Sequence, residues 1–190
     1  MREHSNDSYQ PRLERAARLL AGGGLIAYPT EAVYGLGCLP GDRHAVERLL
    51  HVKRRSWRKG LILIAATFDQ LSSLVVLPSN DLRDEILSSW PGPVSWVLEA
   101  QHGVPPWLGG GRPSLAVRVT DHPLVRKLCN RLHSPLISTS ANRSGRVPLR
   151  RPLSVRREFG TELDEILVGP LGTLERPTIL RDGRSGKVLR

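Results

Sequence analysis

The sequence is poor in cysteine and contains no long apolar run. Cys38 and Cys129 are its only cysteines, and it has neither a C-x-x-C pair nor a histidine–cysteine cluster. We therefore expect two reduced core thiols, no disulfide framework and no protein-bound metal. The apolar runs are too short to span a bilayer, and the first ten residues lack the apolar stretch of a secretory signal. These absences predict a cytoplasmic protein that does not enter a membrane.

Acidic residues are also scarce relative to basic ones. The chain has 28 Lys and Arg against 18 Asp and Glu, which gives a net charge of +10. Such a balance predicts polyanionic partners, either nucleotides or RNA. A length of 190 residues, with apolar periods separated by glycine and proline, suits one globular domain. We expect residues 1–11 to form a flexible N-terminus and residues 12–190 to form the domain.

The stretch from Leu25 to Leu39 looks like two short buried strands with polar residues at the join. Gly35 and Gly37 stand at alternate positions of the second strand, and they leave room beside the backbone for a ligand or another strand. Three polar residues lie near this opening: Thr30, Glu31 and Tyr34. The same pattern also fits a plain strand crossing with a tight bend.

A basic loop follows the next expected helix, which Asp42 caps and which ends near Lys53. Five cations crowd into residues 53–59, immediately before the apolar strand 61–65: Lys53, Arg54, Arg55, Arg58 and Lys59. Cations at a helix C-terminus stabilise the helix by only about 0.3 to 1 kcal/mol, so a solvated loop is one interpretation. The other is a concentrated positive field that holds a triphosphate.

Hydroxyl and amide groups gather where another short strand, residues 135–139, ends. The segment reads Ser138-Thr139-Ser140-Ala141-Asn142-Arg143-Ser144-Gly145. Such groups at a strand end supply donors to a phosphate or a nucleobase, although a serine-rich turn has the same composition. Six arginines between residues 143 and 157 exceed what one nucleotide needs, and they indicate contact with RNA or a partner.

Arg118 is the single charge in the expected buried strand 114–119. A buried guanidinium is costly unless it is paired, so it either reaches an internal carboxylate or faces a cavity that receives an anion. We favour the anion. Around this strand we expect a loop at residues 101–113, a helix capped by Asp121 with Pro123 in its first turn, and a final hairpin of residues 178–181 and 187–190.

Taken together, these segments resemble the YrdC/TsaC-type threonylcarbamoyl-AMP synthases. The resemblance covers residues 12–190, and the motifs are specific in combination. They are Ala27-Tyr28-Pro29-Thr30-Glu31-Ala32-Val33-Tyr34-Gly35-Leu36-Gly37, Lys53-Arg54-Arg55 with Lys59-Gly60-Leu61-Ile62-Leu63-Ile64, Trp90-Pro91-Gly92-Pro93-Val94, Leu115-Ala116-Val117-Arg118-Val119, and the hydroxyl segment from Ser138 to Gly145.

The resemblance implies a single-domain α/β fold, in which a twisted mixed sheet is flanked by helices and has a concave basic face. It implies a nucleotidyltransferase that joins L-threonine, bicarbonate and ATP into threonylcarbamoyl-adenylate and releases pyrophosphate. This is the first step of threonylcarbamoyladenosine formation at position 37 of tRNA, and a separate transferase complex would complete the modification. ATP would be a substrate, accompanied by Mg²⁺.

The resemblance also implies roles for particular residues. Lys53 and Arg55 would act in catalysis and hold the ATP phosphates. Further ATP contacts would come from Lys59, Ser114, Ser138, Ser140, Asn142 and Arg190. The threonine site would be formed by Thr30, Tyr34, Arg118 and Thr178.

Two departures from the family pattern indicate its short bacterial form. Ala32 stands where many members have a second threonine, and residues 61–64 lack the Pro-Leu and His of longer relatives. The chain ends at Arg190, so we also expect the additional C-terminal domain of the long form to be absent. Two alternatives stay open: an RNA-binding module without catalysis, which the net charge favours, and a carbamoyl-adenylate domain like those of hydrogenase-maturation carbamoyltransferases.

Overall fold

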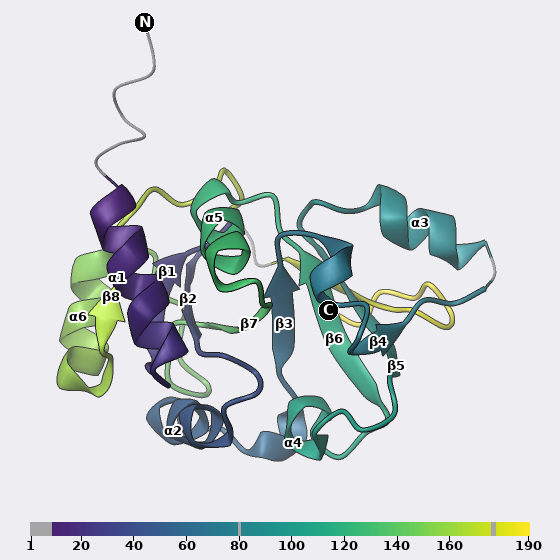
Figure 1. The fold of residues 1–190 in the computed structure, drawn as a ribbon, viewed down its shortest axis with the longest axis horizontal. Helices are drawn as coiled ribbons and strands as arrows, with labels where there is room; N and C mark the ends of the chain where they lie inside the picture. The colour runs from purple at the N-terminus through teal and green to yellow at the C-terminus, as the bar shows by residue number, and fades with distance from the viewer. Residues whose placement is uncertain (1–8, 80, 176–177) are drawn as a thin grey trace, which may run out of the picture.

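A mixed β-sheet runs through the molecule, with helices arranged around it (Figure 1). The computed structural model describes residues 9–79, 81–175 and 178–190. Within them the strand order is β4-β5-β6-β3-β7-β2-β1-β8, and β9 pairs with β5. The pairs β3–β6, β1–β8 and β5–β9 are parallel, whereas the remaining pairs are antiparallel. The prediction of a single α/β domain around a mixed sheet is confirmed.

The elements have the following bounds. The strands are β1 (Ile26–Pro29), β2 (Tyr34–Gly37), β3 (Ile62–Ala65), β4 (Val75–Val76), β5 (Val94–Ala100), β6 (Ser114–Val119), β7 (Leu136–Ser140), β8 (Glu165–Ile166) and β9 (Ile179–Asp182). The α-helices are α1 (Gln10–Ala21), α2 (Arg43–Lys53), α3 (Leu82–Ser88), α4 (Pro106–Gly109), α5 (Pro123–Leu132) and α6 (Pro152–Phe159). Three short 3-10 helices are η1 (Trp57–Lys59), η2 (Phe68–Gln70) and η3 (Gly160–Glu162).

The sheet buries apolar side chains on both of its faces, because successive residues of a strand point to opposite sides. In β1, Ile26 and Tyr28 pack with α1 and α5, whereas Ala27 belongs to the core on the other face, under α2 and α6. Helices α1 and α5 are also joined at their surface, where Arg131 Nε donates to Glu14 Oε2 over 3.0 Å. The strands that carry the polar residues are thus held rigidly from both sides.

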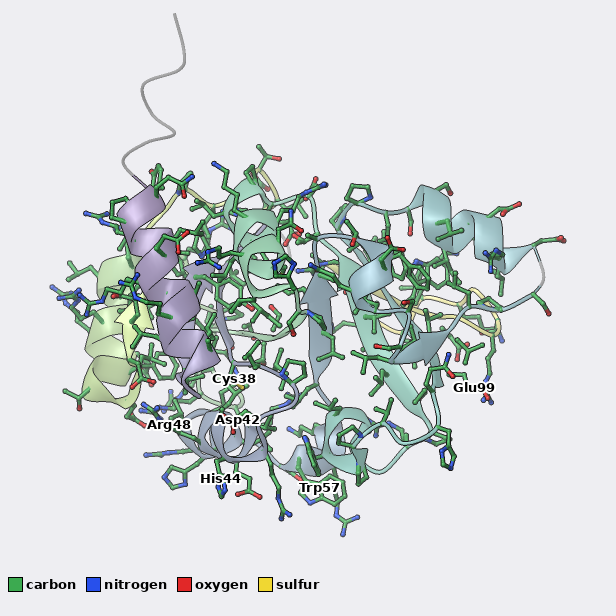
Figure 2. The ribbon with its side chains drawn as sticks, viewed as in Figure 1. Cys38, Asp42, His44, Arg48, Trp57 and Glu99 are labelled. Carbon is green, nitrogen blue, oxygen red and sulfur yellow. The ribbon has the colours of Figure 1, made fainter. Side chains whose placement is uncertain are left out.

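Helix α2 follows the sequence prediction closely. Asp42 caps it, since its Oδ1 accepts a hydrogen bond of 3.0 Å from the Ala45 backbone N–H. Figure 2 shows Asp42 and Cys38 near the start of this helix. The helix ends at Lys53, and Arg54 follows with a φ of 51°, a left-handed conformation that turns the chain away from the helix axis. The basic loop therefore begins at a sharp change of direction.

Three other predictions require correction, and a fourth is confirmed. Helix α1 begins at Gln10, so residues 10 and 11 are helical rather than flexible, and residues 1–8 lie outside the described part. Asp121 does not cap α5, because His122 holds that position without a side-chain capping bond. The expected loop at 101–113 contains α4. The final hairpin forms, with Arg181 bridged to Val188.

Both cysteines are buried and free, as predicted. Burial raises the pKa of each thiol to about 12. The helices in the described ranges include none that combines the length and the apolar character needed to cross a membrane.

Candidate functional site

The join between β1 and β2 is built around Thr30. Its backbone N–H and its Oγ1 both donate to the Val33 carbonyl, over 3.0 and 2.7 Å. The two glycines that follow serve different purposes. A Cβ on Gly37 would lie 2.1 Å from the Ile137 carbonyl oxygen of β7, so this glycine admits a neighbouring strand, whereas Gly35 borders a cavity. The sequence suggested that these glycines leave room for a ligand or for another strand. Gly35 leaves room for a cavity and Gly37 for a strand.

This central cavity has a volume of about 410 Å³. It lies where the β1–β2 join, the start of β3, the end of β7 and the C-terminal segment meet. Many of the predicted site residues line it: Thr30, Arg55, Arg118, Ser138, Ser140, Thr178 and Arg190. Its remaining walls are mostly apolar or small, formed by Ala32, Val33, Gly35, Leu61, Ile62, Thr139 and Pro148. The sequence analysis did not assign these wall residues, because their apolar character is also that of core strands.

An adjoining cavity of about 180 Å³ extends the central cavity beside β6. The two share four lining residues: Arg55, Leu61, Ile62 and Arg190. The adjoining cavity adds Lys59 and Ser114, which were also predicted for the nucleotide. The structure thus brings residues from five distant parts of the chain to one continuous surface.

The shared boundary of these cavities is cationic. Burial lowers the pKa of Arg55, and the nearby charge of Arg190 lowers it further. Arg55 Nη2 donates to the Gly60 carbonyl over 3.0 Å, but its buried Nε has no hydrogen-bond partner in the described structure. Neither cavity has an acidic residue among its described lining residues. Cations held together in this way attract an anion, which satisfies the free donors and removes the repulsion.

Lys53 lies behind the central cavity rather than in its lining. Its side chain is only 2% exposed, and its Nζ donates to the carbonyl oxygens of Ser140 and Asn142. Burial, with the charge of Arg55 as a second cause, lowers the pKa of Lys53 to about 7. Lys53 thus holds the backbone of the hydroxyl segment in place through these two hydrogen bonds.

The side chain of Asn142 also makes hydrogen bonds within the protein. Ser140 Oγ donates to Asn142 Oδ1 over 2.6 Å, and Asn142 Nδ2 donates to the Arg146 carbonyl over 2.6 Å. The hydroxyl segment therefore combines the two sequence interpretations. Ser138 and Ser140 face the cavity, whereas Asn142 closes the turn that presents them.

Arg118 forms the other end of the central cavity. Its Nη2 lies 3.0 Å from Glu31 Oε2, and both side chains are 5% exposed. Its Nη1 donates to Thr178 Oγ1 over 2.6 Å, while its buried Nε has no partner in the described structure. We expected Arg118 either to pair with a carboxylate or to face a cavity. It does both, because it pairs with Glu31 and lines the central cavity. The sequence analysis placed Glu31 near the opening but gave it no role in the site, although a charged residue within an apolar stretch was a usable signal.

Tyr34 was predicted for the threonine site, but it is fully buried and does not line the central cavity. Its hydroxyl donates to the Gly169 carbonyl over 3.0 Å, which ties β2 to the segment leading to Thr178. Burial raises the pKa of Tyr34. The residue thus supports the wall of the cavity from outside.

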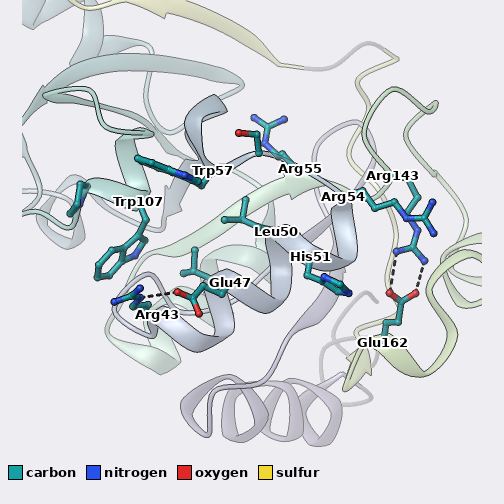
Figure 3. Close-up of a pocket in the computed structure, with 13 residues that line it drawn as sticks. Arg43, Glu47, Leu50, His51, Arg54, Arg55, Trp57, Trp107, Arg143 and Glu162 are labelled. Carbon is teal, nitrogen blue, oxygen red and sulfur yellow. Dashed lines mark hydrogen bonds and ion pairs between the residues drawn. The ribbon is translucent and has the colours of Figure 1, made fainter.

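A larger outer cavity of about 960 Å³ lies between α2, η1 and α4 (Figure 3). Two of its four arginines are paired with carboxylates of the same cavity. Arg43 pairs with Glu47 over 2.8 Å and lies 5.7 Å from the Trp107 ring, while Arg143 pairs with Glu162. Arg55 lines the outer cavity as well as the central one. We place the candidate site in the smaller central cavity, because that cavity gathers the predicted residues without a carboxylate in its lining.

Comparisons with known proteins show which family this chain resembles. A family model described as telomere recombination, covering Sua5, YciO and YrdC, matches residues 18–190. The threonylcarbamoyl-AMP synthase of Nitrosococcus oceani is 53% identical over 179 residues, which are 94% of this chain and 97% of that protein.

Two solved structures share the fold. P. abyssi Sua5 in complex with L-threonine matches with a TM-score of 0.82 and 32% identity, over 90% of this chain and 50% of that one. E. coli YciO matches with a TM-score of 0.79 and 25% identity, over 91% and 84% of the two chains. The family match begins within α1 and includes every residue that lines the central cavity, and the chain belongs to the Sua5/YciO/YrdC family.

Proposed function

We propose that this protein forms threonylcarbamoyl-AMP from L-threonine, bicarbonate and ATP and releases pyrophosphate. This reaction would be the first step of threonylcarbamoyladenosine formation at position 37 of tRNA. The observation that carries the proposal is that one continuous cavity holds Arg118 at one end and the cations Arg55 and Arg190 at the other. Relatives that span nearly the whole chain are named threonylcarbamoyl-AMP synthase, which supports the same activity.

The amino acid would occupy the Arg118 end. The free Nε of Arg118 is a donor for the substrate carboxylate, and Thr30 and Thr178 place hydroxyl groups on the same wall. A charged donor to a carboxylate gives a stronger hydrogen bond than a neutral one. The Sua5 structure of P. abyssi was solved with L-threonine, which supports an amino acid in this fold.

ATP would occupy the other end. Arg55, Lys59 and Arg190 would lie along the phosphates, and the hydroxyl groups of Ser114, Ser138 and Ser140 would supply further donors. Lys53 and Asn142, which were predicted to contact ATP, would act instead by holding the hydroxyl segment in place. This proposal keeps all of these residues in the site, but it distinguishes those that line the cavities from those that hold the lining residues in place.

The chemistry would rest on proximity and charge. The neutral amine of threonine attacks the carbon of bicarbonate, a carbon–nitrogen bond forms, and a carbon–oxygen bond breaks to release water, which gives an N-carboxylate. One oxygen of this N-carboxylate then attacks the α-phosphorus of ATP. An oxygen–phosphorus bond forms, the bond between the α- and β-phosphates breaks, and pyrophosphate leaves with the electron pair. Two anions must approach each other, so cations on both sides of the cavity lower the barrier and stabilise the leaving group.

The described residues do not fit a Mg²⁺ ion held by the protein. They contain no group of three His, Cys, Asp or Glu side chains that could bind a metal, and the cavity lining offers no carboxylate. We therefore propose that Mg²⁺ enters with the triphosphate, as part of the substrate. We further propose that the protein works in the cytoplasm and supplies a transferase complex that modifies tRNA.

The RNA-binding alternative stays a prediction. One of the arginines on which it was based, Arg143, is engaged by Glu158 and Glu162 within the protein. This pairing weakens the argument from the arginine-rich stretch, because a paired cation contributes less to phosphate binding.

Product analysis tests the proposed function. The purified protein is incubated with ATP, L-threonine and ¹³C-labelled bicarbonate, and the adenylate is identified by mass spectrometry. We expect a threonylcarbamoyl-adenylate that carries the label. An Arg118→Met variant should require more threonine for the same yield. An unlabelled adenylate, or the absence of any adenylate, would contradict the proposal.

A further inference from the structure

Glu31 is a buried carboxylate that lies beside the central cavity without lining it. Its two oxygens have separate partners. Oε2 accepts from Arg118 Nη2 over 3.0 Å, and Oε1 accepts from Thr120 Oγ1 over 2.5 Å. Arg118 and Thr120 are two residues apart, at the end of β6 and just beyond it. The Glu31 carboxylate therefore links Arg118 and Thr120, whose side chains point to the same side of the strand.

The backbone around Glu31 also holds the C-terminal wall of the cavity. The Gly172 N–H donates to the Thr30 carbonyl over 3.0 Å, and the Leu174 N–H donates to the Glu31 carbonyl over 3.1 Å. Gly172 approaches so closely that a Cβ there would lie 2.8 Å from the Glu31 Cα. The same segment leads to Thr178, which accepts from Arg118.

These contacts leave Arg118 little freedom. One terminal nitrogen of its guanidinium is held by Glu31, and the other is held by Thr178. The remaining Nε is buried without a partner in the described structure, and Arg118 lines the cavity. A buried donor without a partner destabilises the protein, and a bound acceptor would remove that cost. Glu31 and Thr178 use two of the five N–H donors of the guanidinium, and the unpartnered Nε–H is one of those left for a ligand.

We propose that Glu31 is a positioning residue, which orients Arg118 so that it binds the α-carboxylate of the amino acid substrate. This inference rests on the proposed function, since it assigns the amino acid to the Arg118 end. Glu31 acts through Arg118 and not through the substrate, because its carboxylate is occupied and lies outside the cavity lining. The site therefore selects ligands with a free carboxylate next to the amine.

The test compares L-threonine with L-threoninamide, which lacks the carboxylate charge. Binding of each is measured by calorimetry for the wild-type protein and for Glu31→Gln. We expect the wild type to prefer threonine. In Glu31→Gln the Kd for threonine should rise about tenfold or more, because the charged bond that fixes Arg118 is lost. The Kd for threoninamide and the KM for ATP should change little.

Two further variants separate positioning from folding. Glu162→Gln is the matched control, because Glu162 also pairs with an arginine but lies at the outer cavity. It should bind threonine like the wild type. Thr120→Val keeps the Glu31–Arg118 pair and removes the second bond of the carboxylate, together with the bond that Thr120 Oγ1 accepts from the His122 backbone N–H. It should weaken threonine binding several-fold, with the same lack of effect on the amide.

The outcomes are distinct. Unchanged threonine binding in a folded Glu31→Gln protein would overturn the positioning role and leave the proposed function intact. Equal weakening of threonine, threoninamide and ATP would also overturn it, since Glu31 would then support only the fold. A wild-type protein that turns over ATP without binding threonine would refute the amino acid assignment itself.

Discussion

Replacement of Lys53 by methionine removes the buried amino group that holds the hydroxyl segment. The change keeps most of the length and the apolar stem of the side chain, but it leaves the carbonyls of Ser140 and Asn142 without this donor. The pKa of Lys53 is lowered from 10.5 to about 7, chiefly by burial. Above pH 7 the unfolded chain therefore binds a proton at this position that the folded protein has released.

The sign of the pH dependence follows from this difference. Protonation of the unfolded state alone makes the free energy of unfolding rise with pH between about 7 and 10.5, by roughly 1.4 kcal/mol per pH unit. The cost of burying the charge is fully present below pH 7 and disappears as the pH approaches 10.5. Between pH 7.5 and 9, Lys53 should contribute a gain of about 2 kcal/mol that Lys53→Met lacks.

Urea unfolding at several pH values, followed by tryptophan fluorescence, measures this gain. The raised pKa values of Cys38 and Cys129 act in the opposite direction, because the unfolded thiols lose their protons first. They are common to both proteins, so the difference between wild type and Lys53→Met isolates the lysine. Lys187→Met, at an exposed position, serves as the control. Parallel pH curves for wild type and Lys53→Met would refute the assignment.

Two further predictions address the site and the strand join. Arg55→Ala should raise the KM for ATP at least about tenfold and slow pyrophosphate release, because it removes a charged donor at the boundary of the two cavities. Steady-state kinetics with Arg43→Ala, at the outer cavity, as the control would contradict this if both variants behaved alike. Gly37→Ala should destabilise the protein by about 2 kcal/mol or more, since its Cβ would meet the Ile137 carbonyl oxygen at 2.1 Å. Gly41→Ala, which has nothing within 4 Å, should unfold like the wild type in the same denaturant titration.

Local patterns predicted the fold well where one physical effect dominated. The Asp42 cap of α2 is determined by nearby residues, and it is confirmed. The cap at Asp121 was wrong because α5 begins at Pro123, so that His122 holds the cap position although it makes no side-chain capping bond. The capping preference of Asp121 alone does not decide at which residue the helix begins.

The site was predictable in composition but not in arrangement. The motifs identified the residues that gather at the central cavity, but the distinction between lining and support depends on distant contacts. Lys53 bonds to carbonyls at Ser140 and Asn142, nearly ninety positions away, and no local pattern reports such a bond. The pairing of Arg118 with Glu31 has the same origin, because it joins β6 to the β1–β2 join across the sheet.

Pyrophosphate release tests the central claim most directly, namely that one cavity brings an amino acid carbamate and ATP together. The purified protein is supplied with ATP, and L-threonine and bicarbonate are each omitted in turn. Our account predicts release that requires both. Release that is indifferent to threonine, or no release with all three substrates present, would contradict it.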